Sequence, residues 1–366
     1  MSGETPIIPH DFKFLSSSQS SETRPSILPF CRSLPKVELH AHLINGSVDP
    51  VTLQELGCME TSILDYIKLA SLSNNTSRAL DECFDLFRIA HNATNTPQAV
   101  HLATRRVIED FDKDNVIYLE LRTTPRAEQG MTKQEYVEAI VTAIKEYQGD
   151  VLVKLILSIN RSHDAKACQD SLDVILKKKK LYPDIIKGID LSGNPKVGGF
   201  DSYIFKTARE NGLYTTIHCG EVKNDGEVTD ILGFKPDRIG HGNFVHPDYG
   251  GCQENWELLC EKRVPVECCL TSNVMTNTTR NYSEHHVKEL ISSGLPYTIS
   301  TDDKGVFLTD LSREYSHLYD DHALTKEALW KVSFNSVDYS FASSAEKSLL
   351  KSKMIEWKRD NEALFK

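Results

Sequence analysis

The feature that most constrains the fold of this chain is a repeated alternation of short β-branched runs with longer segments of helical spacing. Eight β-branched runs follow one another, at 37–42, 116–121, 152–159, 186–191, 214–218, 238–241, 264–270 and 297–301. Segments able to form helices lie between most of them, at 97–114, 132–147, 164–181, 200–212, 224–233, 253–262 and 283–294, and helical sequence closes the chain from 311 to 366. Strands that alternate with helices in this way indicate a parallel sheet.

Two architectures fit eight such units: a closed (β/α)8 barrel in a single domain and a doubly wound open sheet. Nearly every predicted strand ends in polar residues, which are His40 and His42, 123–126, 160–161, 190–193, 218–221, His241, 271–273 and 302–303. A barrel gathers such endings at one mouth, whereas an open sheet spreads them along an edge. We therefore predict an α/β fold of the (β/α)8 TIM barrel type with C-terminal helices. Because 43–115 is too long for one helix, we expect an inserted helical segment after the first strand.

Composition and charge narrow the class of protein. Of the 366 residues 40% are hydrophobic and 26% charged, as in soluble globular proteins. Residues 1–32 are rich in Ser, Pro and Thr, so we predict a disordered tail there and one barrel domain over 33–366. The net charge of −10, with no long basic block, argues against nucleic acid as a partner, and no apolar run is long enough to span a membrane. Nine scattered cysteines and the lack of a signal-peptide pattern favour a cytosolic protein, which we expect to be a monomer.

A pair of histidines in the first predicted strand gives the first candidate functional residues. His40 and His42 are two residues apart in the run VELHAHL, and alternate residues of a strand share a face. One cation can therefore bind both imidazoles, and zinc binds histidine nitrogen well while keeping a position open for water in catalytic sites. Two histidines on a polar strand face are more often merely solvated, so the pair alone is weak evidence for a metal site.

Two further residues complete a possible ligand set. His218 ends the fifth predicted strand and Asp302 ends the eighth. Three imidazoles and one carboxylate suit zinc, which lowers the pKa of a bound water so that hydroxide exists near neutral pH. Taken singly, His218 would be read as a satisfied core histidine and Asp302 as a helix N-cap. Their joint placement at strand ends favours the metal site.

Three more polar residues follow the same strands. Glu221 lies three residues after His218, past Cys219 and Gly220, so its carboxyl can reach the mouth as a general acid. His241, between two glycines, could orient or deprotonate an attacking water, and Asp303 could contact the substrate. The alternatives are a surface glutamate, a turn with an incidental histidine, and a helix cap.

These residues carry a resemblance to a known family. The chain resembles the adenosine deaminase family of metal-dependent aminohydrolases in LPKVELHAH at 34–42, HCGE at 218–221, GHG at 240–242 and STDD at 300–303. The match runs in order from residue 34 to the C-terminal helices. It implies a (β/α)8 barrel that holds one zinc ion, with the deaminase domain over 33–366.

The resemblance also implies a role for each residue. The zinc ligands would be His40, His42, His218 and Asp302. Glu221 would protonate purine N1, His241 would help to activate the water, Asp303 would contact N7, and the backbone amide of Gly193 would meet N3. Hydroxide would attack C6, protonation of N1 would remove the resistance of the aromatic ring to this attack, and the amine would leave.

Closer features resemble the adenosine deaminase-like subgroup that acts on N6-methyl-AMP. The segment LRTTPR at 121–126 offers hydroxyls, amides and Arg126 for a phosphate, and His91 in the helical run 84–91 could cap the nucleotide. A strand-exit turn with a surface arginine and a helix-packing histidine are the alternatives. The subgroup implies substrate contacts at His42, Asn45, His91, Thr123, Thr124, Pro125, Arg126 and Gly193. We expect Asn160, Glu221 and Asp303 to contact the substrate as well.

The sequence departs from the subgroup at two positions. Ile44 is an extra residue after the histidine pair, so Asn45 can be displaced, and Asn160 stands where the subgroup has an aspartate. We nevertheless expect zinc-dependent hydrolysis of N6-methyl-AMP, and of related N6-substituted AMP, to IMP with release of methylamine. The alternatives are an adenosine or aminopurine deaminase and a nucleotide-binding protein without catalysis.

Overall fold

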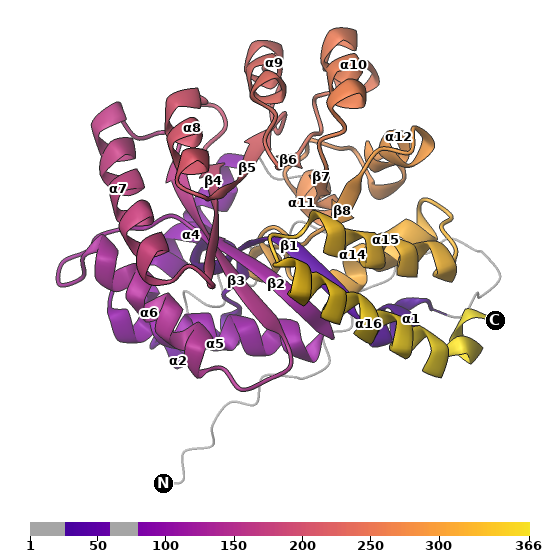
Figure 1. Ribbon diagram of the computed structural model, residues 1–366, viewed down its shortest axis with the longest axis horizontal. Helices are drawn as coiled ribbons and strands as arrows, with labels where there is room; N and C mark the ends of the chain where they lie inside the picture. The colour runs from indigo at the N-terminus through magenta and orange to yellow at the C-terminus, as the bar shows by residue number, and fades with distance from the viewer. Residues whose placement is uncertain (1–25, 59–79) are drawn as a thin grey trace, which may run out of the picture.

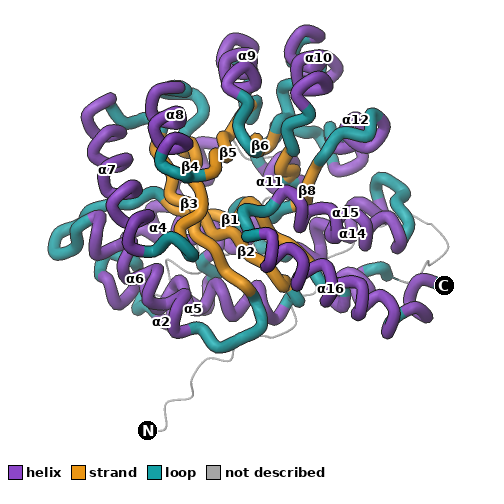
Figure 2. Tube along the Cα trace, viewed as in Figure 1, coloured by secondary structure: helices purple, strands orange, loops and turns teal. Residues whose placement is uncertain are grey.

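Eight parallel strands occupy the centre of the molecule and pair in sequence order, from β1 to β8. The computed structural model describes residues 26–58 and 80–366. Figures 1 and 2 show the strands surrounded by helices. The strands are β1 Lys36–His42, β2 Val116–Thr123, β3 Leu152–Asn160, β4 Ile186–Ser192, β5 Tyr214–Cys219, β6 Arg238–His241, β7 Val266–Cys268 and β8 Tyr297–Ile299. The predicted (β/α)8 barrel is confirmed.

The ring closes just beyond β8, at residues that the sequence had suggested as metal ligands. Ala41 of β1 forms an isolated parallel bridge with Asp302. The Asp302 amide donates to the His40 carbonyl (2.8 Å) and the His42 amide donates to the Asp302 carbonyl (3.0 Å). Barrel closure therefore holds the backbones of these three residues side by side.

The helices follow the predicted order around the barrel. They are α1 Leu28–Ser33, α2 Pro50–Glu55, α4 Leu80–Ala93, α5 Pro97–Lys113, α6 Lys133–Glu146, α7 Ala165–Leu181, α8 Ser202–Glu210, α9 Asp225–Phe234, α10 Gln253–Lys262, α11 Leu270–Met275, α12 Val287–Ser292, α13 Lys304–Phe307, α14 Leu311–Asp320, α15 Lys326–Tyr339 and α16 Ser344–Asp360. Capping boxes start α6 (Thr132 with Glu135) and α16 (Ser343 with Glu346), as expected where a short hydroxyl precedes a glutamate by three residues. The inserted helical segment is also confirmed, because α2 and α4 lie between β1 and α5.

Two boundaries differ from the sequence expectation. The seventh run, 264–270, is a strand only over Val266–Cys268, and α11 begins at Leu270, because an apolar run does not by itself distinguish a strand from a buried helix. The predicted tail ends before residue 32, since α1 buries Phe30 and Cys31. Phe30 packs edge-on against Phe365, with ring centroids 5.4 Å apart, and this contact with the chain end was invisible in the local sequence. The rest of the predicted tail, 1–25, lies outside the described residues.

Charged side chains fill the barrel interior beneath the mouth. Arg238 donates to Glu120 (2.5 Å) and to Glu267 (2.6 Å), and Arg122 donates to Glu267 (2.8 Å), all fully buried. Buried charges are tolerated only when they are paired and hydrogen-bonded, as they are here. Arg122 also lines the cavity, so this charged layer lies directly beneath it. No helix in the described ranges is both long and apolar enough to cross a membrane.

Candidate active site

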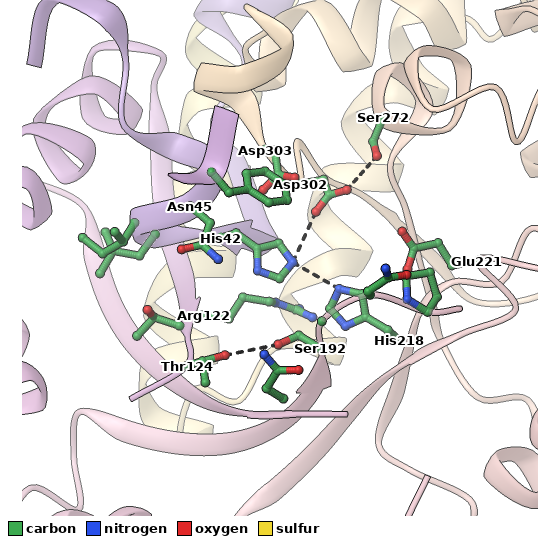
Figure 3. A pocket seen from close by; sticks show the side chains of 18 of the residues that line it. His42, Asn45, Arg122, Thr124, Ser192, His218, Glu221, Ser272, Asp302 and Asp303 are labelled. Carbon is green, nitrogen blue, oxygen red and sulfur yellow. Dashed lines mark hydrogen bonds and ion pairs between the residues drawn. The ribbon is translucent and has the colours of Figure 1, made fainter. Parts of the chain in front are cut away.

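A cavity of about 410 Å³ opens at the carboxyl ends of the strands, where catalytic residues of such barrels lie. This volume is in the range of small-molecule sites. Figure 3 shows side chains from distant parts of the chain that point into it. The predicted site residues that line it are His42, Asn45, His91, Thr123, Thr124, Asn160, Gly193, His218, Glu221, His241, Asp302 and Asp303.

Three histidines and one aspartate meet at the base of the cavity. The Nε2 atoms of His42 and His218 lie 3.1 Å apart. Asp302 Oδ1 lies 3.3 Å from His42 Nε2 and 3.4 Å from His40 Nε2 (Figure 3 labels all but His40). The four side chains come from β1, β5 and the residues just beyond β8, so the structure brings together all four predicted ligands.

Buried carboxylates fix the far side of two of these rings. His40 Nδ1 lies 2.7 Å from Glu267 Oε2, and His218 Nδ1 lies 3.0 Å from Asp190 Oδ1. Burial opposes ionisation of Glu267, yet the charges of Arg122 and Arg238 hold its pKa well below the usual value. Asp190 likewise has a lowered pKa despite burial, because of His218 and Arg122. An ionised carboxylate only accepts hydrogen bonds, so each Nδ1 carries the ring hydrogen. Each Nε2 then directs its lone pair to the centre of the cluster.

The donor set fits a divalent metal ion. Two facing Nε2 lone pairs and a carboxylate repel one another unless a cation lies between them. His40 Nε2 is buried and makes no hydrogen bond within the described part of the chain. Although burial and Arg122 act against it, contacts with Asp302 and Glu267 raise the pKa of His40 to about 9. In the absence of a metal ion a proton would therefore take its place at Nε2, so the cluster favours a positive charge at this point. Imidazole nitrogens with one carboxylate oxygen are a common set for zinc and similar ions.

His241 lies beside this cluster, and its position would also allow it to be a metal ligand. Its Nε2 is 3.8 Å from Asp302 Oδ2 and 4.0 Å from Glu221 Oε1. Gly240 lets the neighbouring backbone approach the cluster, since a Cβ there would lie 2.8 Å from Cε1 of His40. Ligand-type atoms of His40, His218, His241 and Asp302 lie within 4.8 Å of one another, so distance alone does not separate His241 from the ligands.

Two carboxyl groups that face the cavity favour their protonated forms. Burial first, and the Asp302 charge second, raise the pKa of Glu221 to about 8. The same two causes raise the pKa of Asp303 well above its usual value. Asp303 Oδ1 is buried without a hydrogen-bond partner among the described residues. Near neutral pH both groups can therefore donate a proton or a hydrogen bond to an acceptor in the cavity.

The segment around Ile44, the residue expected to be extra, forms a π-helical turn, η1 Leu43–Ser47. A π-turn accommodates one added residue without displacing the later part of the chain. Asn45 consequently faces the cavity, where its side-chain oxygen contacts His91 Nε2 of α4. Gly46 is needed for this path, because a Cβ there would overlap Asp303 Oδ1.

Asn160 and Gly193 form one wall of the cavity. Asn160 Oδ1 accepts from the Ser162 amide (2.9 Å), a role that an aspartate would fill equally well. Its amide nitrogen adds a donor that an aspartate lacks. Gly193 has φ +103°, and a Cβ there would collide with Asn160 Oδ1.

The structure does not bring two of the predicted substrate contacts to the cavity. Pro125 and Arg126 are not among its lining residues. The Arg126 guanidinium instead binds the end of α4, with Nη2 donating to the Thr94 carbonyl (2.6 Å) and the His91 carbonyl (3.2 Å). An arginine that does line the cavity is Arg88 of α4, whose side chain is exposed. The sequence did contain a signal for Arg88: it precedes His91 by three residues in a predicted helix, so the two side chains lie on the same helix face.

Sequence reasoning assigned no role to Asp190, Glu267 or Arg122. Glu267 and Asp190 contact the outer nitrogens of His40 and His218, and Arg122 pairs with both carboxylates. Each lies in the middle or at the end of an apolar strand, and each is fully buried. A charge in such a run is expensive to bury, which was the signal that it has a partner. Ser272 was likewise missed as a partner, and its Oγ donates to Asp302 Oδ2 (2.7 Å; Figure 3).

The chain is similar over most of its length to proteins of one family. A family model described as adenosine deaminase matches residues 35–357. An N6-methyl-AMP deaminase from Homo sapiens is 36% identical over 343 residues, which is 92% of this chain and 96% of that protein. The crystal structure of Arabidopsis N6-mAMP deaminase MAPDA is 35% identical, with a TM-score of 0.81 over 90% of this chain and 99% of that one. A crystal structure of Arabidopsis ADAL complexed with IMP is 34% identical, with a TM-score of 0.79 over 90% of this chain and 99% of that one.

Proposed function

Because the chain belongs to the adenosine deaminase family, we propose that it hydrolyses N6-methyl-AMP, and related N6-substituted AMP, to IMP and the corresponding amine. The observation that carries the proposal is the position of Glu221, a carboxyl with a raised pKa, beside the cluster of three histidines and Asp302. Relatives named N6-methyl-AMP deaminases support the choice of substrate.

We propose zinc as the metal, with His40, His42, His218 and Asp302 as its ligands. Three imidazole nitrogens and one carboxylate oxygen suit zinc and leave a coordination position for water. The bound metal would supply hydroxide near neutral pH by lowering the pKa of that water. Glu267 and Asp190 support the assignment because they hold two of the imidazoles with Nε2 directed at the centre.

The two protonated carboxyl groups match the chemistry of a purine ring. Ring nitrogens N1 and N7 of an aminopurine only accept hydrogen bonds, so a residue that binds them must donate. Glu221 would transfer its proton to N1, which makes C6 electrophilic, and Asp303 would donate a hydrogen bond to N7. The Gly193 amide would meet N3 from the opposite wall. Attack at C6 then gives a tetrahedral carbon that carries the new hydroxyl group. The hydroxyl proton would pass to the amine nitrogen, and the C6–N bond would break as the C6 carbonyl forms and the neutral amine leaves. The proton released when water became hydroxide would return to Glu221.

A substrate panel tests the proposed function directly. The purified protein with one equivalent of zinc is assayed on AMP, adenosine, N6-methyl-AMP and N6-methyladenosine, with release of ammonia or methylamine as the readout. We expect N6-methyl-AMP to have the highest kcat/KM. Preference for adenosine would favour the nucleoside deaminase instead, and no turnover of any of the four would favour a binding protein without catalysis. A cytosolic location and a monomeric state stay predictions.

The phosphate contact is a separate prediction. We propose Arg88 for it in place of Arg126, because Arg88 lines the cavity and Arg126 does not. We expect Arg88→Ala to raise the KM for N6-methyl-AMP by about 10–100-fold, since a hydrogen bond to a charged group contributes about 1.5–3 kcal/mol. Turnover of N6-methyladenosine should change little, because the nucleoside lacks the phosphate. Steady-state kinetics on the two substrates provide the measurement.

Two further arginine variants separate a direct contact from an indirect one. Arg105→Ala, in an exposed pair with Glu109 on α5, serves as the matched control and should behave as the wild type. Arg126→Ala should lower activity on nucleotide and nucleoside alike, because it loosens the end of α4 that carries His91. A loss in Arg126→Ala that is confined to the nucleotide would contradict this assignment and return the phosphate contact to Arg126.

A further inference from the structure

A chain of hydrogen bonds between buried polar side chains, here called the relay, connects the start of α12 with Nδ1 of His241, the ring nitrogen that points away from Asp302. Its members are His285, which directly precedes the N-cap of α12, and Asn273 of α11. Both are fully buried and His241 is 1% exposed, so water does not compete for their hydrogen bonds. Buried polar groups of this kind adopt one hydrogen-bond arrangement, and the proton on each atom can be deduced from its neighbour.

A main-chain donor sets the tautomer of His285. The Val287 amide donates to His285 Nδ1 (3.1 Å), so this nitrogen is an acceptor and carries no hydrogen. Burial, and secondarily the nearby His286, lowers the pKa of His285 well below its usual value, in keeping with a neutral ring. A neutral ring with a bare Nδ1 has its hydrogen on Nε2. His285 Nε2 therefore donates to Asn273 Oδ1, which lies 3.0 Å away.

The His285 donor in turn fixes the orientation of the Asn273 amide. With its oxygen turned to His285, Asn273 presents Nδ2 to the other side, where it lies 3.1 Å from Thr278 Oγ1 and 3.5 Å from His241 Nδ1. An amide nitrogen only donates, so His241 Nδ1 is the acceptor of this longer bond. A ring whose Nδ1 accepts does not carry hydrogens on both nitrogens, so the hydrogen of His241 lies on Nε2, the atom that faces Asp302 and Glu221.

We propose that Asn273 and His285 are positioning residues that hold His241 as the Nε2–H tautomer. His241 then presents a hydrogen-bond donor to the oxygen that attacks the purine, and stabilises negative charge on it, instead of removing its proton. The same tautomer has no Nε2 lone pair for a metal, which leaves His42 as the third imidazole ligand. The catalytic part of this inference rests on the proposed function, whereas the tautomer itself does not.

The tautomer can be measured without turnover. The zinc-loaded protein is labelled with ¹⁵N-histidine, and long-range ¹H–¹⁵N correlation spectra distinguish protonated from unprotonated ring nitrogens. His241 is assigned from the resonances that vanish in His241→Gln. We expect an unprotonated Nδ1 and a protonated Nε2. A protonated Nδ1 in the wild type overturns the proposal, whether or not the protein is active on any purine.

An isosteric variant tests whether the relay causes this state. Asn273→Asp replaces the amide donor by an acceptor, so His241 Nδ1 should become protonated. Its ¹⁵N resonance should then shift to the region of protonated ring nitrogens. Asn243→Asp is the matched control, because Asn243 is equally buried and contacts His286, not His241, through its side chain. Its His241 resonances should stay at their wild-type positions. An equal shift in both variants, or none in Asn273→Asp, overturns the relay, and the wild-type spectrum decides alone if Asn273→Asp fails to fold.

Kinetics give the functional readout. We expect Asn273→Asp to lower kcat for N6-methyl-AMP by about 10–100-fold, an effect of the size that is typical when a partner that orients a metal-ligating histidine is removed. The KM should change little, since Asn273 does not line the cavity. A changed KM with an unchanged kcat would contradict the positioning role. Failure of the substrate panel would remove the proposed function and leave the tautomer measurement intact.

Discussion

Glu221→Gln is expected to lower kcat for N6-methyl-AMP by about 10²–10⁴-fold, the contribution typical of a positioned general acid. The amide of glutamine keeps the shape of the side chain and can donate a hydrogen bond to N1, but it cannot transfer a proton. The substrate should therefore still bind, with KM within a few fold of the wild type. Steady-state kinetics, together with the zinc content of the purified variant, provide the measurement.

A neighbouring glutamate supplies the matched control for this variant. Glu227 on α9 is exposed to nearly the same extent as Glu221, 14% against 13%, but it pairs with Arg161 (3.1 Å) and does not line the cavity. Glu227→Gln should retain most of the wild-type kcat. If Glu221→Gln were as active as Glu227→Gln, the role of Glu221 as proton donor would be wrong.

The pH dependence offers a check on the same group. Burial and the Asp302 charge raise the pKa of Glu221 to about 8, so in the absence of other charges the acid form persists through neutral pH and is lost above that value. A bound cation acts in the opposite direction and moves the loss to lower pH. In either case the fall of the kcat/KM profile that begins at the pKa of Glu221 should be absent in Glu221→Gln, and a fall that remains belongs to Asp303, the other cavity carboxyl with a raised pKa.

Removal of the metal is expected to abolish turnover and to lower stability. A chelator should leave a folded protein without activity, and one equivalent of zinc should restore it. A ligand that binds only the native state contributes about 4 kcal/mol to the free energy of unfolding at a concentration about 1,000 times its Kd. Thermal unfolding of the protein with and without zinc should therefore show a higher Tm for the zinc form.

A pair of histidine variants tests whether the proposed ligands hold this metal. His218→Gln removes an imidazole from the centre and should abolish both zinc retention and turnover. His246→Gln serves as the control, because His246 packs against Trp256, with ring centroids 4.6 Å apart, and does not line the cavity. Full zinc content in His218→Gln, measured by metal analysis, would contradict the ligand set.

The outline of the barrel follows from local pattern. β-branched runs and helical spacing are short-range properties, so the strand over Arg238–His241 and the helix over Gln253–Lys262 could be predicted to the residue. The pattern was insufficient at 264–270, where buried strand and buried helix share one apolar sequence and only the packing of α11 against its neighbours distinguishes them. The same limit applies to α1, which is ordered by aromatic contacts with residues more than 300 positions away.

The sequence by itself determined that this chain forms a barrel and that His40, His42, His218, Glu221 and Asp302 meet at its mouth, because strand ends converge in any such barrel. Only the tertiary structure decided that Arg88 and Arg122 line the cavity while Arg126 does not, that the segment around Ile44 forms η1, and which carboxylates contact the outer nitrogens of the histidines. The reason is physical: strand alternation fixes the direction of a side chain on a strand, whereas loop and helix-end residues take their direction from contacts with segments far away in the chain.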